Sequence, residues 1–240
     1  RFSLMEARHF SSNGHSPVKE GELALLVAKR LKEKLVGYGA KVVLLREKNE
    51  PVTSSRPGDF HQEADSWVSG KEFNLKKKYE PEEREKMLRK RREVLFYRIS
   101  EIRARAKLVN EVVRPDLVIC LHLNAAPWPS SEKQELEERN DFHVLVNGCY
   151  MGGELSNDRQ RFEMIYRLVN GWARTEQRVA ECISRAFSGL TQLPAFRYKG
   201  PNALKIGSVP GVWARNLLAN RSYYCPVVFL EPYVANSRDA

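Results

Sequence analysis

Three side chains in this sequence combine types that suit metal binding and proton transfer: Glu20, His122 and Glu231. Carboxylate oxygens and neutral imidazole nitrogens are both common zinc ligands. A carboxylate can also accept a proton and return it as a general acid and base. The three lie far apart in the chain, so the chemistry depends on the elements that would carry them.

Two of the three residues close short apolar runs. The run 117–121 ends on His122, and the run 227–230 ends on Glu231. Each run is too short for a helix and contains β-branched residues, which predicts strands buried on both faces. Ligands collect at the carboxyl ends of strands in open α/β sheets. The alternatives are a core histidine with satisfied hydrogen bonds at 122 and a surface carboxylate just past the strand end at 231.

Glu20 precedes a predicted helix that runs from about residue 21 to 36. Its apolar positions recur at helical spacing: Leu23, Val27, Leu31 and Leu35. Gly37 and Gly39 are typical of a helix end. Glu20 therefore falls in the first turn, where a carboxylate also suits the helix macrodipole without any further role.

The remaining pattern alternates helices with strands. Further strands are predicted at 41–45, 142–146 and 203–206, and further helices at 160–169 and 172–187. This order predicts an α/β fold: a twisted mixed, mostly parallel sheet of about five or six strands with helices on both faces. We expect one domain over residues 1–240, with a charged helical insertion at about 60–100.

Composition limits the class of protein. An apolar fraction of 42% with 29% charged residues is typical of a globular protein, and no apolar run is long enough to cross a bilayer. A net charge of +10 favours a negatively charged partner. The basic cluster 89–92 could contact nucleic acid, but interleaved glutamates favour a solvated helix face. The four cysteines show no Cys-x-x-Cys spacing, which argues against a thiolate zinc site.

Taken together, these stretches resemble the zinc-dependent N-acetylmuramoyl-L-alanine amidases. The match rests on the glutamate before the first helix, on Leu121-His-Leu-Asn-Ala125 and on the glutamate that ends the last strand. Weaker echoes are Arg46 after a predicted strand, Arg105 with Asn110, and Asn236. The resemblance covers about half of the chain.

The resemblance implies a role for each matched position. Glu20 and His122 would be ligands of a Zn²⁺ cofactor, and Glu231 would be the catalytic glutamate. Asn124 would steady the loop after the histidine. Arg215 and Asn216, in a segment similar to one that lines the family's groove, could hold a substrate carboxylate or carbonyl, although surface or capping roles are equally open.

The sequence departs from the family in one respect. The family begins with a strand that runs into Asp-Pro-Gly-His-Gly-Gly, whose histidine is the first zinc ligand, and nothing similar precedes Glu20. We expect that element to lie upstream of Arg1, in a longer protein. His15, which follows Gly14, is the local substitute that fits best, and His9 is a weaker one.

The family resemblance implies a cell-wall hydrolase that cuts the amide bond between N-acetylmuramic acid and L-alanine. The expected partner is peptidoglycan, and the expected location is extracytoplasmic, either periplasmic or secreted. Three alternatives stay open: an amidase-like domain that only binds wall polymer, another zinc peptidase or deacetylase, and a basic nucleic-acid-binding protein. Nucleic acid is not favoured.

Overall fold

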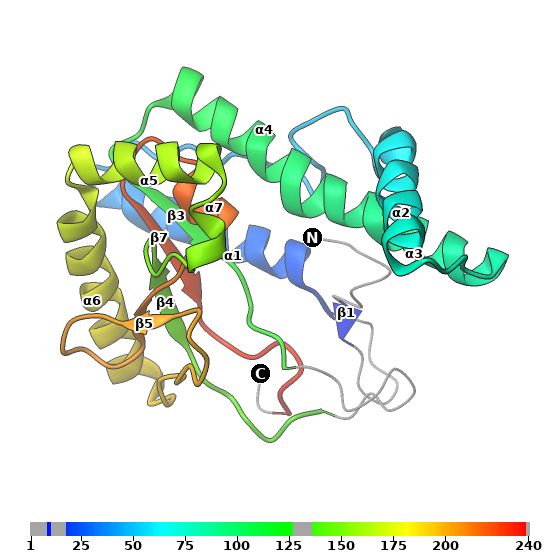
Figure 1. The fold of residues 1–240 in the computed structure, drawn as a ribbon. Helices are drawn as coiled ribbons and strands as arrows, with labels where there is room; N and C mark the ends of the chain where they lie inside the picture. The colour runs from blue at the N-terminus through cyan, green and yellow to red at the C-terminus, as the bar shows by residue number, and fades with distance from the viewer. Residues whose placement is uncertain (1–8, 11–17, 127–135, 239–240) are drawn as a thin grey trace.

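The structure is a computed structural model, and it describes residues 9–10, 18–126 and 136–238 (Figure 1). Its elements follow in chain order: β1 (His9–Phe10), β2 (Val18–Lys19), α1 (Glu20–Gly37), η1 (Pro57–Phe60), α2 (His61–Leu75), α3 (Pro81–Glu93), η2 (Val94–Ser100), α4 (Glu101–Lys107), η3 (Leu108–Val113), β3 (Val118–Leu121), β4 (His143–Val146), η4 (Gly152–Glu154), α5 (Asp158–Val169), α6 (Trp172–Thr191), β5 (Leu204–Lys205), β6 (Val212–Ala214), α7 (Leu218–Arg221) and β7 (Val227–Glu231).

A mixed five-stranded sheet organises the fold, in the order β3-β7-β4-β6-β5. The β3–β7 and β4–β6 pairs are parallel, whereas β7–β4 and β6–β5 are antiparallel. The carboxyl ends of β3 and β7 therefore meet at one edge of the sheet, beside the amino end of β4. This confirms the α/β class and the mixed sheet that the sequence predicts.

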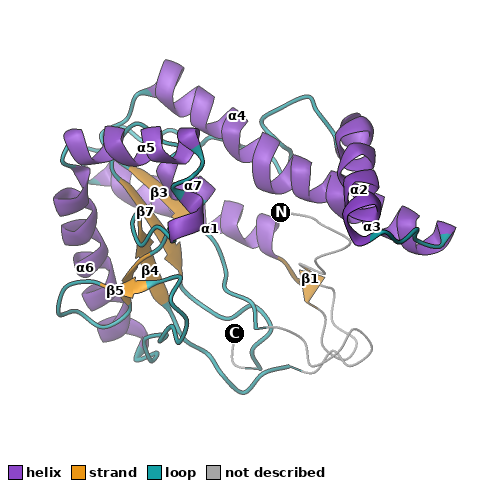
Figure 2. Cartoon of the chain, in the orientation of Figure 1, coloured by secondary structure: helices purple, strands orange, loops and turns teal. Residues whose placement is uncertain are grey.

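Helices cover both faces of this sheet. Val227 and Val228 are both fully buried and point to opposite faces, as neighbours in a strand must. Val228 packs in a cluster with Ala180 of α6, and Val227 packs in a cluster with Ala106 of α4. Figure 2 shows the strands lying between α6 and α1.

The sequence prediction was wrong about residues 41–45, which form no strand. It was also wrong about the burial of β3, where only Val118 is buried. The two errors are linked, because the missing strand would have covered the outer side of β3. β3 is an edge strand, and among the described residues no strand pairs with its outer side. Leu45 packs against the cluster around Val118 through its side chain, without joining the backbone ladder.

The charged stretch after residue 60 is helical. α2 and α3 form a hairpin with a small core of Ala64, Val68 and Leu88. The helix then continues as π-helical turns at 94–100 and 108–113 on either side of α4. In Figure 1 the α2–α3 hairpin lies away from the sheet, at the far end of the continuous helical stretch 94–113. None of the described helices has the length and apolar character that a membrane crossing requires.

Candidate active site

Glu20 opens α1 at the point where β2 runs directly into the helix, and only 3% of the residue is exposed. A buried carboxylate requires hydrogen-bond partners to offset its desolvation. Two come from the end of β3: His122 Nδ1 lies 2.9 Å from Glu20 Oε1, and the backbone N–H of Leu123 donates to the same oxygen at 3.4 Å. The first helix is thereby joined to the edge strand through this carboxylate.

Arg46 helps to fix the start of α1. Its guanidinium donates to the carbonyl of Gly21, and it also donates to Asn49 Oδ1 at 3.3 Å. The segment that follows residues 41–45 is thus held by a side chain rather than by strand pairing. This contact fixes the backbone next to Glu20.

His122 lies between a carboxylate and an aromatic ring. Its imidazole stacks on Phe229 of β7, with ring centroids 4.4 Å apart and an interplanar angle of 13°. Its backbone N–H donates to Leu230 O at 3.0 Å, which continues the parallel pairing of β3 with β7. The side chain is 28% exposed, so the ring is held on one side and open to solvent on the other.

The loop after His122 is held by two asparagines. Asn124 Oδ1 accepts from the backbone N–H of Ala125, and the Asn124 backbone pairs with residues 233 and 235. Asn236, which is fully buried, accepts from the N–H of Ala126 at 2.9 Å and donates to its carbonyl at 3.1 Å. These bonds join the loops that follow β3 and β7, and so fix the backbone beside His122.

Glu231 ends β7 and pairs with His143 at the start of β4. The two side chains meet at 2.7 Å, between Glu231 Oε2 and His143 Nε2. Burial raises the pKa of Glu231, but the hydrogen bond and charge of His143, with the charge of His122, outweigh that effect and lower it overall. Glu231 is therefore a carboxylate at neutral pH, able to accept a proton.

A tyrosine and an arginine extend this pair. The Tyr198 hydroxyl lies 3.1 Å from His143 Nε2, and Arg215 Nη1 donates to that hydroxyl at 3.3 Å. Arg215 also lies over the Tyr198 ring, 5.4 Å from its centroid. The structure therefore brings Arg215 into a chain of contacts that leads to Glu231.

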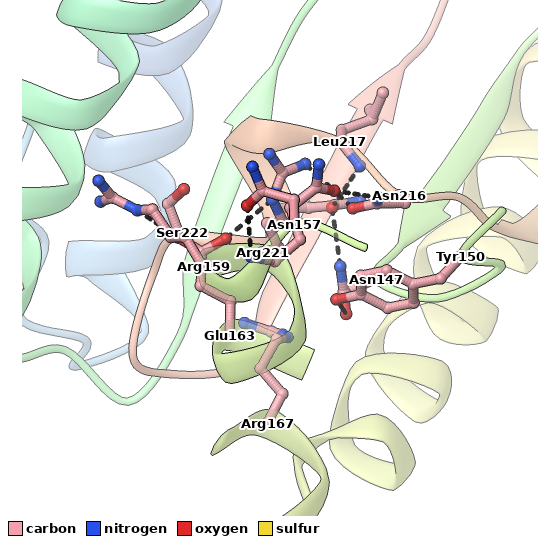
Figure 3. Close-up of polar contacts among 12 residues, drawn as sticks. Asn147, Tyr150, Asn157, Arg159, Glu163, Arg167, Asn216, Leu217, Arg221 and Ser222 are labelled. Carbon is pink, nitrogen blue, oxygen red and sulfur yellow. Dashed lines mark hydrogen bonds and ion pairs between the residues drawn. The ribbon is translucent and has the colours of Figure 1, made fainter. Parts of the chain in front are cut away.

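Asn216 points elsewhere. β6 runs parallel to β4, and β4 runs antiparallel to β7, so the end of β6 lies at the opposite edge of the sheet from Glu231. Asn216 follows that end, donating to Gln160 Oε1 at 2.9 Å and accepting from Arg221 at 3.1 Å (Figure 3). The structure does not bring Asn216 together with the other candidate residues, and its role stays a prediction.

The donor chemistry at Glu20 and His122 fits zinc in part. Their side chains supply a carboxylate oxygen and an imidazole nitrogen that face each other, which are ligand types of zinc hydrolases. A catalytic zinc normally takes three protein ligands. Across residues 18–126 and 136–238, no group of three His, Cys, Asp or Glu side chains is placed to hold an ion. His15 lies outside the described residues.

Comparison with known proteins finds distant structural likeness only. No family model and no curated protein sequence matches the chain. The solved amidase Ami1 from Mycobacterium smegmatis is 11% identical over 100% of this chain and 79% of its own, with a TM-score of 0.47. Ami1 from Mycobacterium abscessus is 18% identical over 57% of this chain and 49% of its own, at 0.34. Cwp6 from Clostridium difficile is 12% identical over 96% of this chain and 24% of its own, at 0.39. Likeness at this level does not establish a family.

Sequence reasoning left His143 unassigned and did not single out Tyr198. The sequence left the facing of His143 open, since a histidine at the start of a strand can face either side. Its partner follows from the antiparallel register of β4 on β7, which the sequence does not specify. Tyr198 lies in a loop, where spacing predicts nothing about which side chains meet.

Proposed function

We propose that the chain is a zinc-dependent amidase that hydrolyses the bond between N-acetylmuramic acid and L-alanine in peptidoglycan. The observation that carries the proposal is the convergence at one sheet edge of Glu20, His122 and Glu231. The sequence resemblance supplies the substrate class. Peptidoglycan as partner and an extracytoplasmic location, periplasmic or secreted, follow from the same resemblance and belong to the proposal.

Glu20 and His122 would hold the ion, together with a third ligand from outside the described residues. A zinc ion there would supply Lewis acidity, polarising the scissile carbonyl and making water a better nucleophile at neutral pH. Burial of Glu20 and the stacking of His122 on Phe229 limit how far either ligand can turn. The chain's own contribution at this position is a pair of ligands with fixed orientation.

Glu231 would move the proton. Its lowered pKa keeps it ionised, so it can accept a proton from the attacking water and pass it to the departing amide nitrogen. His143 holds the carboxylate through Oε2. Arg215 and Tyr198 lie beyond this pair, where the guanidinium suits a carboxylate of the stem peptide.

The test is digestion of purified peptidoglycan by the zinc-supplemented protein, with the products identified by mass spectrometry. The proposal predicts peptides that begin with a free L-alanine amine, and muramic acid residues with a free lactyl carboxylate. Glu231→Gln should reduce the rate by about 10²- to 10⁴-fold. The exposed Glu138→Gln is the matched control and should leave the rate unchanged. If the unaltered protein cleaves a different bond in peptidoglycan, that result would contradict the proposal.

A second candidate is a domain that binds wall polymer without cutting it. The observation in its favour is that no three candidate zinc ligands lie together among the described residues. Sedimentation with insoluble peptidoglycan separates the two candidates. Binding without any released product, in the presence of zinc, would favour the second.

A further inference from the structure

A group of arginines lies where α5 meets α7, at the sheet edge opposite Glu231. Figure 3 shows Arg159, Arg221 and Asn216 grouped around Glu163. Arg159 Nε donates to Glu163 Oε1 at 3.1 Å, and Arg221 Nε donates to Glu163 Oε2 at 2.8 Å. Both carboxylate oxygens are thus used, each by the inner nitrogen of a different guanidinium.

This use of Glu163 fixes two guanidinium groups while leaving both outer nitrogens of Arg159, and Nη2 of the mostly buried Arg221, without a hydrogen bond among the described residues. The Glu163 side chain is 4% exposed, whereas Arg159 is 57% exposed. Arg221 gives Nη1 to Asn216, and Arg159 makes no hydrogen bond through its terminal nitrogens within the described residues. Because the buried carboxylate already orients both arginine side chains, they lose less conformational entropy when an anion binds.

A third arginine, Arg103, interacts electrostatically with Arg159, Arg221 and Glu163. Partial burial and then the charges of Arg159 and Arg221 lower the pKa of Arg103, and the opposite effect of Glu163 does not offset them. Arg103 lies on α4, which contacts α7. Two guanidinium groups therefore share one carboxylate, and the charges of all three residues act on a third guanidinium, that of Arg103. The neighbouring Asp158 is already paired with Arg161. Such an excess of positive charge is stabilised by an anion.

We propose that Arg103, Arg159 and Arg221 form a binding site for a phosphoryl group. A planar carboxylate can be bound in one plane by a single arginine. A tetrahedral oxyanion presents acceptors in several directions, and it is therefore the better match for guanidinium groups from three side chains on three helices. The site is separate from Glu20, His122 and Glu231 and does not depend on the proposed amidase activity.

Two sources could supply the phosphoryl group: a lipid headgroup, or a phosphate that is free or carried on a polymer. The solvent face of α5 bears an apolar stripe beside the arginines. Its residues are 51% to 81% exposed: Phe162, Ile165, Leu168 and Val169. An apolar helix face next to cationic side chains is the pattern of helices that lie on anionic bilayers. This stripe provides the means to separate the two sources.

The first experiment titrates the protein with inorganic phosphate at low ionic strength and follows the arginine Nε–H resonances by NMR. Saturable shifts at Arg159 and Arg221 are expected. Arg103→Gln and Arg159→Gln should each weaken the affinity by about tenfold or more, since each removes charged hydrogen-bond donors. Arg185→Gln on α6, an exposed arginine of equal charge, should change the affinity by less than about twofold. Shifts that do not saturate, or equal losses in all three variants, would overturn the proposal.

The second experiment identifies the source by sedimentation with phosphatidylglycerol vesicles and with phosphatidylcholine vesicles. If the source is a lipid headgroup, phosphatidylglycerol vesicles bind the protein, and both Arg159→Gln and Phe162→Ser weaken that binding. If the source is a free or polymer-borne phosphate, inorganic phosphate binds while neither vesicle does, and Phe162→Ser has no effect on the phosphate affinity. Failure of both probes rejects the site. Melting curves of each variant establish that it is folded.

Discussion

Oε2 of Glu231 lies 2.7 Å from Nε2 of His143, a pairing set by the antiparallel register of β7 on β4. His143 is 1% exposed, so this imidazole has no freedom to leave the carboxylate for solvent. The pair gives the candidate catalytic carboxylate a fixed orientation and a lowered pKa. It links the strand pairing of the sheet to the chemistry proposed at its edge.

Replacing His143 with phenylalanine should raise the pKa of Glu231. The histidine lowers that pKa, so its loss leaves burial as the dominant effect, and burial raises the pKa of an acid. NMR titration of ¹³C-labelled glutamate side chains measures the change directly. In the amidase assay, the acidic limb of the rate profile should move to higher pH, and kcat should fall by about tenfold or more through loss of a charged hydrogen bond. An unchanged Glu231 titration would show that His143 only fills space.

Zinc binding should depend on Glu20 and on His122. Substitution of even outer-shell partners of zinc ligands costs about 10- to 100-fold in metal affinity, so His122→Ala and Glu20→Gln should each cost at least that much. Calorimetric titration of chelator-treated protein with zinc measures the affinity. His61→Ala, which changes a histidine of the α2–α3 hairpin, is the matched control and should bind as the unaltered protein does. Equal affinity in all four proteins would place any zinc elsewhere.

A parallel measurement on His15→Ala asks whether this residue is the third ligand. A loss of zinc affinity comparable to that of His122→Ala would assign the role to His15. Unchanged affinity would leave the third ligand to another residue outside the described part of the chain. The measurement uses metal affinity rather than catalysis, so it is informative even for an inactive chain.

Breaking the buried pair of Arg167 and Glu176 should destabilise the fold strongly. The two side chains are 5% and 1% exposed and bonded to each other. Arg167 also donates to Tyr223 O at 2.9 Å, and Glu176 accepts from the N–H of Val227 at 2.7 Å, so the pair ties α5 and α6 to the start of β7. Removing one partner leaves a buried charge, which costs about 3–5 kcal/mol of unfolding free energy.

Urea denaturation of Arg167→Met, Glu176→Leu and the double variant measures that cost. The double variant should lose less than the sum of the single losses, because it leaves no uncompensated charge. Strictly additive losses would contradict a coupled pair. Arg185→Met on α6, where the side chain is 63% exposed, should change stability by less than about 0.5 kcal/mol.

The thiols should differ in reactivity in the native state. Burial raises the pKa of the Cys120 thiol to about 12 and that of Cys225 to about 11, so both are protonated near neutral pH. Only the thiolate reacts with iodoacetamide. Cys182 is exposed on α6 and should be alkylated first, whereas Cys120 and Cys225 should react only after unfolding. Peptide mapping by mass spectrometry after a short exposure gives the order, and early labelling of Cys225 would contradict its buried position.

The sequence by itself determined the elements whose pattern is local. Apolar spacing predicts α1, and short β-branched runs predict β3 and β7, because a buried face repeats with the period of the backbone. Strand ends also marked His122 and Glu231, since a polar residue that closes an apolar run stands out from its neighbours. The helices α5 and α6 followed from the same periodicity.

Tertiary structure decided everything that depends on register and on pairing between distant segments. The failure of residues 41–45 to pair with β3 cannot be predicted from their composition, which is that of a strand. The contact of His143 with Glu231, and the separation of Arg215 from its neighbour Asn216, follow from the directions of β4, β6 and β7. Strand direction is set by the packing of the whole sheet, so the spacing of apolar residues within one strand does not predict it.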